Sequence, residues 1–246
     1  MSLARRGTAS GTRLGMYRCI KFGVDRLPTG NVARHIHREG YATIILSGGF
    51  IEAAFAGRVR AEPGMALLHG AFDCHANVGS ARSGPTIIRL PWRGDGPEGP
   101  YRVSDPDLLA RLAERDPVEA ACALEESMEQ IAPLAESWSD RLAEALRCNG
   151  VARLRTWADQ QGLSPSSVSR GFREAYQVSP QRFQLEARTR MAWRRIVTER
   201  TSLTSIAHEC AFSDLAHMSR SVAAMMGAWP TAWRNPRALE GRDATS

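Results

Sequence analysis

The chain has 246 residues, of which 43% are hydrophobic and 24% are charged, a composition typical of a globular protein with one large domain or two modest ones. The first residues are basic but lack an apolar run, and no stretch approaches the roughly 18 apolar residues of a membrane-spanning helix. We therefore expect a cytoplasmic protein, associated with the nucleoid if it binds DNA. The five cysteines are scattered without a Cys-x-x-Cys pair, which argues against a disulfide framework and a zinc knuckle.

Positive charge is concentrated in the second part of the chain. Residues 1–139 contain 16 basic and 16 acidic side chains, whereas residues 140–246 contain 16 basic and 10 acidic ones. Of the 32 basic residues, 31 are arginine, the side chain best suited to phosphate and guanine. This asymmetry favours nucleic acid as a partner of the second part.

The first hundred residues have the pattern of a β-domain. Short apolar runs such as YATIILSGGF and GPTIIRLPW are separated by glycines and turn residues, with no helical period between them. Closely spaced strands of this kind are typical of a small barrel or sandwich. The Gly/Pro-rich segment RGDGPEGP (93–100) predicts the end of this domain, which we place at residues 1–100.

Residues 101–138 predict two connecting helices. In the second, Asp116 is a good N-cap, Pro117 fits the first helical position, and apolar residues from Val118 to Ile131 trace one face before Pro133 ends it. We expect these helices either to pack on the barrel or to form a contact between the two subunits of a homodimer.

The remainder of the chain is helical in period and contains an internal repeat of fifty residues. The aligned pairs include Ser164 and Asp214, Ser169 and Ser219, Arg170 and Arg220, and Pro180 and Pro230. Each copy has a short helix, a tight turn at Gly162 or Ala211, and a second helix. Ser164 or Asp214 can cap the free amides at the start of that second helix. The pattern therefore predicts two helix-turn-helix motifs in tandem.

Residues 180–197, between the two copies, predict one long helix of about 27 Å at ~1.5 Å per residue. Successive major-groove faces on one side of B-DNA are about 34 Å apart. A single chain is therefore expected to place two recognition helices in adjacent grooves. The second copy also contains four potential metal donors, but its turn separates them, so we predict no metal site there; they are His208, Glu209, Cys210 and His217.

The segments LSPSSVSRGFREAYQVSPQRF, SIAHECAFSDLAHMSR and GAWPTAWR resemble the AraC/XylS family of bacterial transcription regulators, in order and at that family's spacing. The resemblance covers about 100 residues and implies an all-α DNA-binding domain at residues 139–239, with a disordered tail at 240–246. It implies double-stranded DNA as a partner, a small-molecule effector, and RNA polymerase if the protein is an activator. Ala211, Val222 and Ala223 replace the family's glycine, phenylalanine and lysine, which predicts weaker DNA binding by the second copy.

Carried over residue by residue, the resemblance assigns one groove-facing set to each recognition helix. The first set is Ser166, Ser169 and Arg170, and the second is Leu215, Ala216, Ser219 and Arg220. Arginine can donate two hydrogen bonds to guanine, whereas leucine and alanine can only contact a thymine methyl group. We therefore expect Arg170 to be the main base reader, with a phosphate or an acidic neighbour as the alternative partner of Arg170 and Arg220. Arg173, Arg188 and Arg234 are expected to contact phosphate or to be solvated charges, and not to read bases.

The N-terminal part is similar to a cupin barrel. The segment from Gly64 to His75 has the spacing of the second cupin motif, and RHIHREG supplies His35 and His37 as in the first, although Glu39 comes too early to be its acid. Alternate residues of a strand face the same way, so the three histidines are expected to point together. They could line an effector pocket, bind Zn, Fe or Ni, or have no functional role. We predict an effector pocket, with no metal and no cofactor.

The sequence therefore predicts an α+β protein: a cupin-like β-barrel followed by an all-α domain with two helix-turn-helix motifs joined by a long helix. The predicted function is that of a sequence-specific transcriptional regulator that responds to a small molecule in the barrel and is not an enzyme. A metal-dependent cupin enzyme fused to a DNA-binding module is the alternative, and the incomplete first cupin motif counts against it.

Overall fold

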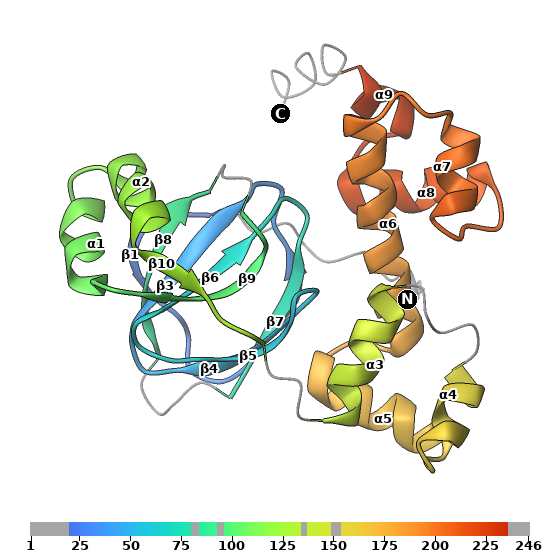
Figure 1. The fold of residues 1–246 in the computed structure, drawn as a ribbon, viewed down its shortest axis with the longest axis horizontal. Coiled ribbons are helices and arrows are strands. Elements are labelled where there is room, and N and C mark those ends of the chain that lie inside the picture. Colours follow the sequence, from blue (N-terminus) through green and yellow to red (C-terminus); the bar gives the residue numbers. More distant parts are fainter. Residues whose placement is uncertain (1–19, 80–83, 93–95, 134–136, 149–153, 236–246) are drawn as a thin grey trace, which may run out of the picture.

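The computed structural model describes residues 20–79, 84–92, 96–133, 137–148 and 154–235; the tail predicted at residues 240–246 lies outside these ranges. Figure 1 shows a β-domain followed by a set of helices. This arrangement confirms the predicted fold class. Among the described residues, none of the helices combines the length and the apolar character that crossing a lipid bilayer requires.

Two antiparallel sheets form the β-domain. The six-stranded sheet has the order β1-β8-β3-β6-β9-β10, with strands Gly23–Arg26 (β1), Thr86–Pro91 (β8), Tyr41–Ser47 (β3), Met65–His69 (β6), Gly99–Val103 (β9) and Met128–Gln130 (β10). The four-stranded sheet has the order β2-β7-β4-β5, with strands Val32–Ile36 (β2), Cys74–Val78 (β7), Phe50–Ala54 (β4) and Gly57–Ala61 (β5). Ile45 and Leu67 of the first sheet pack against Phe50 and Val59 of the second, because alternate strand residues point toward the space between the sheets.

The six-stranded sheet continues beyond residue 100, where the sequence placed the end of the barrel. Strand β9 begins at Gly99, inside the Gly/Pro-rich segment, and pairs with β6. The helix predicted to run to Ile131 ends at Ser127, and β10 follows and pairs with β9. Met128 has an extended backbone (φ −108°, ψ 142°), and it supplies the edge of β9 with a hydrogen-bonded partner. Sheet pairing therefore outweighs the helical pattern of this short segment.

Helices α1 (Pro106–Ala113) and α2 (Pro117–Ser127) pack on the six-stranded sheet. Asp105 accepts from the Leu108 amide and Asp116 from the Val118 amide, each at 2.8 Å, which satisfies amides that would otherwise lack a partner. Figure 1 shows both helices on the side of the β-domain that faces away from the C-terminal helices. Of the two placements that the sequence allowed, the structure shows packing on the barrel, and the homodimer stays a prediction.

The C-terminal helices form two similar units along one long helix. They are α3 (Trp138–Arg147), α4 (Leu154–Gln160), α5 (Pro165–Tyr176), α6 (Pro180–Thr198), α7 (Leu203–Glu209), α8 (Leu215–Met226) and α9 (Pro230–Arg234). In Figure 1, α4 and α5 lie near one end of α6 and α7 and α8 near the other. Ser164 caps α5 and Asp214 caps α8, and the preceding turns contain Gly162 and Ala211 with φ of 66° and 57°. These features are the two predicted helix-turn-helix motifs.

The β-domain and the C-terminal helices share a hydrophobic core. Phe55 and Phe72 of the β-domain are buried together with Phe183 of α6, and Trp193 and Trp233 pack against the same cluster. The Phe55 and Phe183 rings are 5.5 Å apart in a T-shaped contact, a favourable arrangement for two aromatic rings. The two parts of the chain are therefore packed as one unit and not merely linked along the chain.

Candidate DNA-binding surface and barrel pocket

One face of α5 carries the four residues predicted to approach DNA from the first motif. Ser166, Arg170 and Arg173 are exposed and Ser169 is half-buried. Their spacing of three and four residues places them on one side of the helix. The opposite side is buried and consists of Val168, Phe172 and Tyr176. The helix is thus fixed by its apolar side, and its arginines face outward.

The corresponding face of α8 carries less charge. Leu215, Ala216 and Arg220 are exposed and Ser219 is half-buried, as in α5. At the position that corresponds to Arg173 the second copy has Ala223, so this face presents one arginine where α5 presents two.

Arg234 of α9, predicted to contact phosphate, is exposed and donates a hydrogen bond to the carbonyl of Thr201 at 2.5 Å. In this arrangement Arg234 connects α9 to the residues that precede α7. A contact to phosphate would compete with this bond.

The metal donors of the second copy do not converge. Cys210 is buried, Glu209 pairs with Arg195 at 2.5 Å, and the Nδ1 atom of His217 lies 3.1 Å from the hydroxyl of Ser213. Among the described residues, the groups of side chains with metal-ligand geometry include none of these donors. Ile206, Ala207 and Phe212 of the same segment are buried in the hydrophobic core.

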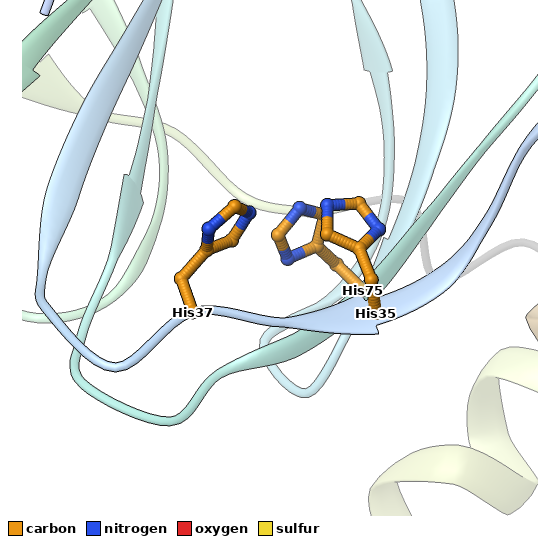
Figure 2. A group of neighbouring side chains, drawn as sticks. All are labelled: His35, His37 and His75. Carbon is orange, nitrogen blue, oxygen red and sulfur yellow. The ribbon is translucent and has the colours of Figure 1, made fainter. Parts of the chain in front are cut away.

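The three barrel histidines meet at one place. His35 lies on β2, His37 directly follows that strand and His75 lies on β7, and His35 is paired directly with His75 across the two strands. The ring centroids are 4.9 Å apart for His35 and His37, 4.3 Å for His35 and His75, and 5.4 Å for His37 and His75. Figure 2 shows all three rings on the same side of the strands that carry them. The alternation of side chains on β2 and the pairing with β7 therefore produce the predicted cluster.

Ring nitrogens of His35 and His75 have neighbouring oxygen atoms within hydrogen-bond distance. The Nδ1 atom of His35 lies 2.9 Å from the carbonyl oxygen of Ala33, and the Nε2 atom of His75 lies 3.1 Å from the hydroxyl of Tyr41. The Nδ1 atom of His75 is buried and has no hydrogen-bond partner among the described residues. Burial, together with the neighbouring His69, lowers the pKa of His75 well below its ordinary value, so this imidazole is neutral near pH 7.

Next to the histidines lies a second polar group that the sequence analysis did not identify. The Nδ1 atom of His69 lies 2.9 Å from Oδ2 of Asp73, and its Nε2 atom lies 3.5 Å from Oε2 of Glu52, too far for a good hydrogen bond. Burial raises the pKa of Glu52 to about 7, although His69 opposes this shift. Burial would lower the pKa of His69, but Glu52 and Asp73 outweigh it and raise that pKa. A lone acid in the otherwise apolar strand FIEAA was the available sequence signal for Glu52.

Two cavities are candidates for a ligand. One, of about 260 Å³, lies inside the barrel, and its lining includes His35, His37, Tyr41, Glu52 and His75. It therefore contains the histidine cluster and its buried acid.

The second cavity, of about 710 Å³, lies between the barrel and α6 and is lined by Arg147, Arg190 and Arg194 among others. All three arginines already have partners: Arg147 donates to the Phe55 carbonyl at 2.6 Å, and the other two pair with Glu98. The barrel cavity has a buried ring nitrogen without a partner, so it is the better candidate for a ligand site.

Comparison with known proteins places the C-terminal helices in a family. Residues 157–236 match the family described as Helix-turn-helix domain. A search of curated protein sequences finds no match. Among solved structures, the chain is similar to a probable AraC family transcriptional regulator from Rhodopseudomonas palustris, with 24% identity, coverage of 42% of this chain and 98% of that chain, and a TM-score of 0.37.

Two further structures give the same kind of likeness. For the C-terminal domain of AraT, a response regulator from Geobacillus stearothermophilus, identity is 18%, coverage is 42% of this chain and 89% of that chain, and the TM-score is 0.39. For ToxT from Vibrio cholerae, identity is 8%, coverage is 87% of this chain and 97% of that chain, and the TM-score is 0.39.

A pair of capped helix-turn-helix motifs on one connecting helix defines a DNA-binding protein. The match over residues 157–236, together with the resemblance of the same residues to AraC/XylS regulators, makes the assignment more specific. Residues 157–236 therefore form a helix-turn-helix domain of the AraC type.

Proposed function

We propose that the protein is a sequence-specific transcriptional regulator whose DNA binding is controlled by a small ligand in the barrel cavity. The observation that carries this proposal is the packing of the cavity strands and the DNA-binding helices into one hydrophobic core. A ligand can shift the equilibrium between two arrangements of the helices only if its contacts differ between them. Direct contacts between the cavity strands and α6 provide such a difference.

Strand β2 connects the cavity to α6. Arg34 directly precedes His35, and its Nε atom donates to Oε2 of Glu186 on α6 at 2.9 Å. Both side chains are 8% exposed. Nη1 of Arg34 donates to the carbonyl of Ala53 on β4 at 3.1 Å. A ligand that moves His35 or His37 therefore displaces the strand that carries this buried ion pair.

The loop between β6 and β7 makes a second connection through its apolar side chain. Phe72 is buried and has a φ of 57°. Residues other than glycine adopt this backbone conformation only at an energetic cost. Its ring contacts Trp193 of α6 at 4.7 Å and Trp233 of α9 at 5.5 Å. This packing contact holds the loop in place and connects it to both helices.

The same loop is connected to α6 by charge. Arg190 of α6 is 4% exposed, and it donates from Nε to the carbonyl of Ala71 at 2.9 Å. Its Nη1 atom lies 3.8 Å from Oδ1 of Asp73, while both Nη atoms donate to Glu98. Since Asp73 also contacts His69, a change at the barrel histidines alters the surroundings of a buried cation on α6.

On the DNA side, we propose that α5 provides most of the base recognition and that α8 contributes mainly backbone contacts. Arg170 and Arg173 are exposed on one face of α5, and arginine gives the strongest discrimination of guanine. Helix α8 contains a single arginine, Arg220, because Ala223 stands at the position that corresponds to Arg173. The neutral members of the two sets complete the proposed surface: Ser166, Ser169, Leu215, Ala216 and Ser219.

Selection of bound sequences from random duplex DNA tests the proposal, with the full chain at moderate salt. We expect enrichment of one motif that spans two adjacent major-groove segments. The control is the double variant Arg170→Ala and Arg220→Ala, which removes one exposed arginine from each recognition helix and leaves the cores intact. If the wild-type protein enriches nothing over bulk DNA, the proposed sequence-specific function is wrong.

Ligand control requires a separate experiment. Footprinting of the sites bound in the genome identifies neighbouring genes, and the small molecules on which their products act are then added to a gel-shift assay. We expect at least one of them to change the affinity for the selected site in the wild type and to have a smaller effect in Arg34→Met. If none of them changes the affinity, control by these small molecules is excluded.

A further inference from the structure

The geometry of the barrel cavity points to the chemical class of its ligand. The candidate ligand atoms of His35, His37 and His75 all lie within 4.8 Å of one another. Two nitrogens bound to one Zn²⁺ at about 2.0–2.1 Å cannot be more than about 4.2 Å apart. The three nitrogens therefore need only a small approach toward one another to share an ion.

One ring nitrogen of His35 and one of His75 already have a hydrogen-bond partner, as in metal-binding histidines. In metal sites, the nitrogen that does not bind the ion donates to a backbone carbonyl, a carboxylate or water, and this fixes the ring. The contact of His35 with the Ala33 carbonyl, at 2.9 Å, is of this kind. In the tautomer in which His75 Nε2 donates to the Tyr41 hydroxyl, Nδ1 of His75, buried and without a described partner, is an acceptor that can bind an ion. A buried acceptor left unpaired costs about 1–3 kcal/mol, and an ion bound to it removes that cost.

Next to the histidine cluster the nearest charged group favours a cation over an anion, although Lys21, Arg26 and Arg89 also line the wider cavity. Glu52 is 5% exposed and lies within 4.8 Å of ligand atoms of His69 and His75. Asp73 stands behind His69. Arg89, which also lines the cavity, pairs with Asp25 at 2.5 Å. An anionic ligand would be placed beside Glu52, whereas a divalent cation is stabilised by it.

We propose that the barrel binds one divalent transition-metal ion through His35, His37 and His75, with Glu52 as the neighbouring acid, and that this ion is the effector of the regulator. Imidazole nitrogens select zinc, nickel, copper, cobalt or iron over magnesium and calcium, which prefer oxygen ligands. The proposal rests on the proposed function, since it names the ligand that controls DNA binding.

The ion would act through the two connections already described. Drawing His35 and His37 toward His75 pulls β2 toward β7, and β2 carries the Arg34–Glu186 pair. His75 follows the loop whose Phe72 and Asp73 contact α6. The bound ion therefore alters the contacts that hold the connecting helix of the two recognition helices.

Metal binding is tested on the full chain after removal of metal by a chelator. Calorimetric titration with zinc sulfate and with nickel sulfate is expected to give one ion per chain, and titration with magnesium chloride no binding. His37→Ala and His75→Ala should abolish the stoichiometric site. The matched control is His208→Ala, an exposed histidine of α7, which should bind as the wild type does.

Two further variants keep the result interpretable if His75→Ala does not fold. His35→Ala removes a half-buried ligand and is the milder change. Tyr41→Phe keeps all three ligands and removes only the hydroxyl at 3.1 Å from His75, and it should weaken metal binding by about 10- to 100-fold. Thermal unfolding of each variant establishes that it is folded, and the wild type should show a higher Tm with zinc than without it.

The effector role is measured as DNA affinity with and without saturating zinc, on the motif from the selection experiment. We expect a change of about 5- to 150-fold, the range of a coupling of 1–3 kcal/mol, and no change in His37→Ala. Selection of a motif without any metal binding would overturn this inference and leave the proposed function intact. Metal binding that survives His37→Ala and His75→Ala would refute the site. Binding at this site without any change in DNA affinity would refute the effector role and favour a metal-dependent activity of the barrel.

Discussion

The first helix-turn-helix unit is joined to the barrel by ion pairs, whereas the second is joined mainly to α6. Asp140 of α3 accepts from Nε and Nη2 of Arg58 on β5 at 2.7 and 3.0 Å, and the Tyr176 hydroxyl of α5 donates to the same carboxylate. In the second unit, Arg195 of α6 pairs with Glu209 of α7, and contact with the barrel is through the aromatic cluster around Phe72. The unit whose recognition helix carries two exposed arginines is thus the one with an ion pair to the barrel.

The hydrophobic core of the first unit is built from aromatic rings, whereas that of the second is built from smaller or more flexible side chains. In the first, Phe172 stacks on Tyr176 at 4.7 Å and makes a T-shaped contact with Phe183 at 5.5 Å. In the second, the position of Phe172 is occupied by Val222, and the other buried residues of α8 are Met218, Met225 and Met226. Methionine fills irregular space with a flexible side chain. The comparison indicates a rigid recognition helix in the first unit and a more adaptable one in the second, and four predictions test this difference.

The largest expected effect is on stability in the two cores. Phe172→Ala should lower the free energy of unfolding by about 3–5 kcal/mol, as other buried Phe→Ala changes do. Val222→Ala should lower it by about 1.5–2 kcal/mol, since it removes two methyl-sized groups at about 0.8 kcal/mol each. Urea unfolding of the full chain measures both values. Equal losses, or a greater loss for Val222→Ala, would mean that the first core is not the better packed of the two.

A smaller effect is expected from the ion pair that joins the first unit to the barrel. Burial alone would raise the pKa of Asp140, but hydrogen bonds from Arg58 and Ser137 outweigh it and lower that pKa. Arg58→Ala should therefore cost about 1.5–3 kcal/mol near pH 7, the range for hydrogen bonds to a charged group. Because the folded pKa is depressed, this stabilisation is lost as the pH falls through it.

The difference between wild type and Arg58→Ala in urea unfolding should consequently shrink from pH 7 to acidic pH. Arg155→Ala, an exposed arginine of α4, is the control and should show little difference at either pH. If the difference in free energy of unfolding between wild type and Arg58→Ala stays constant as the pH falls, Asp140 is not the group through which Arg58 stabilises the protein.

The recognition surfaces should differ in DNA affinity and in base preference. Arg170→Ala should weaken specific binding by about 10- to 100-fold and relax the preference at one position of the site, since an arginine–guanine pair discriminates by roughly 1–3 kcal/mol. Arg220→Ala should weaken binding less and more evenly across sequences, as the loss of a phosphate contact does. Binding curves on the selected site and on scrambled DNA compare the two. A larger and more base-selective loss for Arg220→Ala would assign the main reading role to α8.

The smallest effects are expected at the two turns. Ala211 has a φ of 57°, where its counterpart Gly162 has 66°, and a left-handed residue other than glycine costs roughly 1–2 kcal/mol. Replacing Ala211 by glycine removes this cost, but the greater conformational freedom of glycine in the unfolded chain offsets part of the gain in stability. Ala211→Gly should therefore stabilise the protein by up to about 1 kcal/mol, and Gly162→Ala should destabilise it by a similar amount. Thermal unfolding measures both variants. A higher Tm for Ala211→Gly and a lower Tm for Gly162→Ala would confirm that the two turns are equivalent, and shifts of the same sign would contradict it.

Sequence reasoning worked best where local chemistry decides the structure. The capping residues Ser164 and Asp214 and the turns at Gly162 and Ala211 each act on neighbouring backbone, so the fifty-residue repeat was sufficient to predict both motifs. The same holds for His35 and His37, because the alternation of side chains on one strand places them together. These features need no knowledge of distant contacts.

Sequence reasoning failed where segments that are distant along the chain meet in the fold. The edge pairing of β9 with β10 overrode a helical pattern that was clear in the sequence up to Ile131, and the Gly/Pro-rich segment contributed a strand in place of a boundary. Glu52 and Asp73 come next to the histidines only through the register of β4, β6 and β7, which a single sequence does not specify. The shared core of barrel and helices was likewise not predicted, because apolar helix faces do not reveal what covers them.

The most direct test of the account is a footprint of the full-length protein on its selected DNA site. If α5 and α8 of one chain enter adjacent major grooves, protection should cover two segments on one face of the duplex, about 10 base pairs apart centre to centre. Arg170→Ala should reduce protection in one segment and Arg220→Ala in the other, at protein concentrations where a single chain is bound. Protection of a single segment, or of two segments only when two chains are bound, would contradict the account.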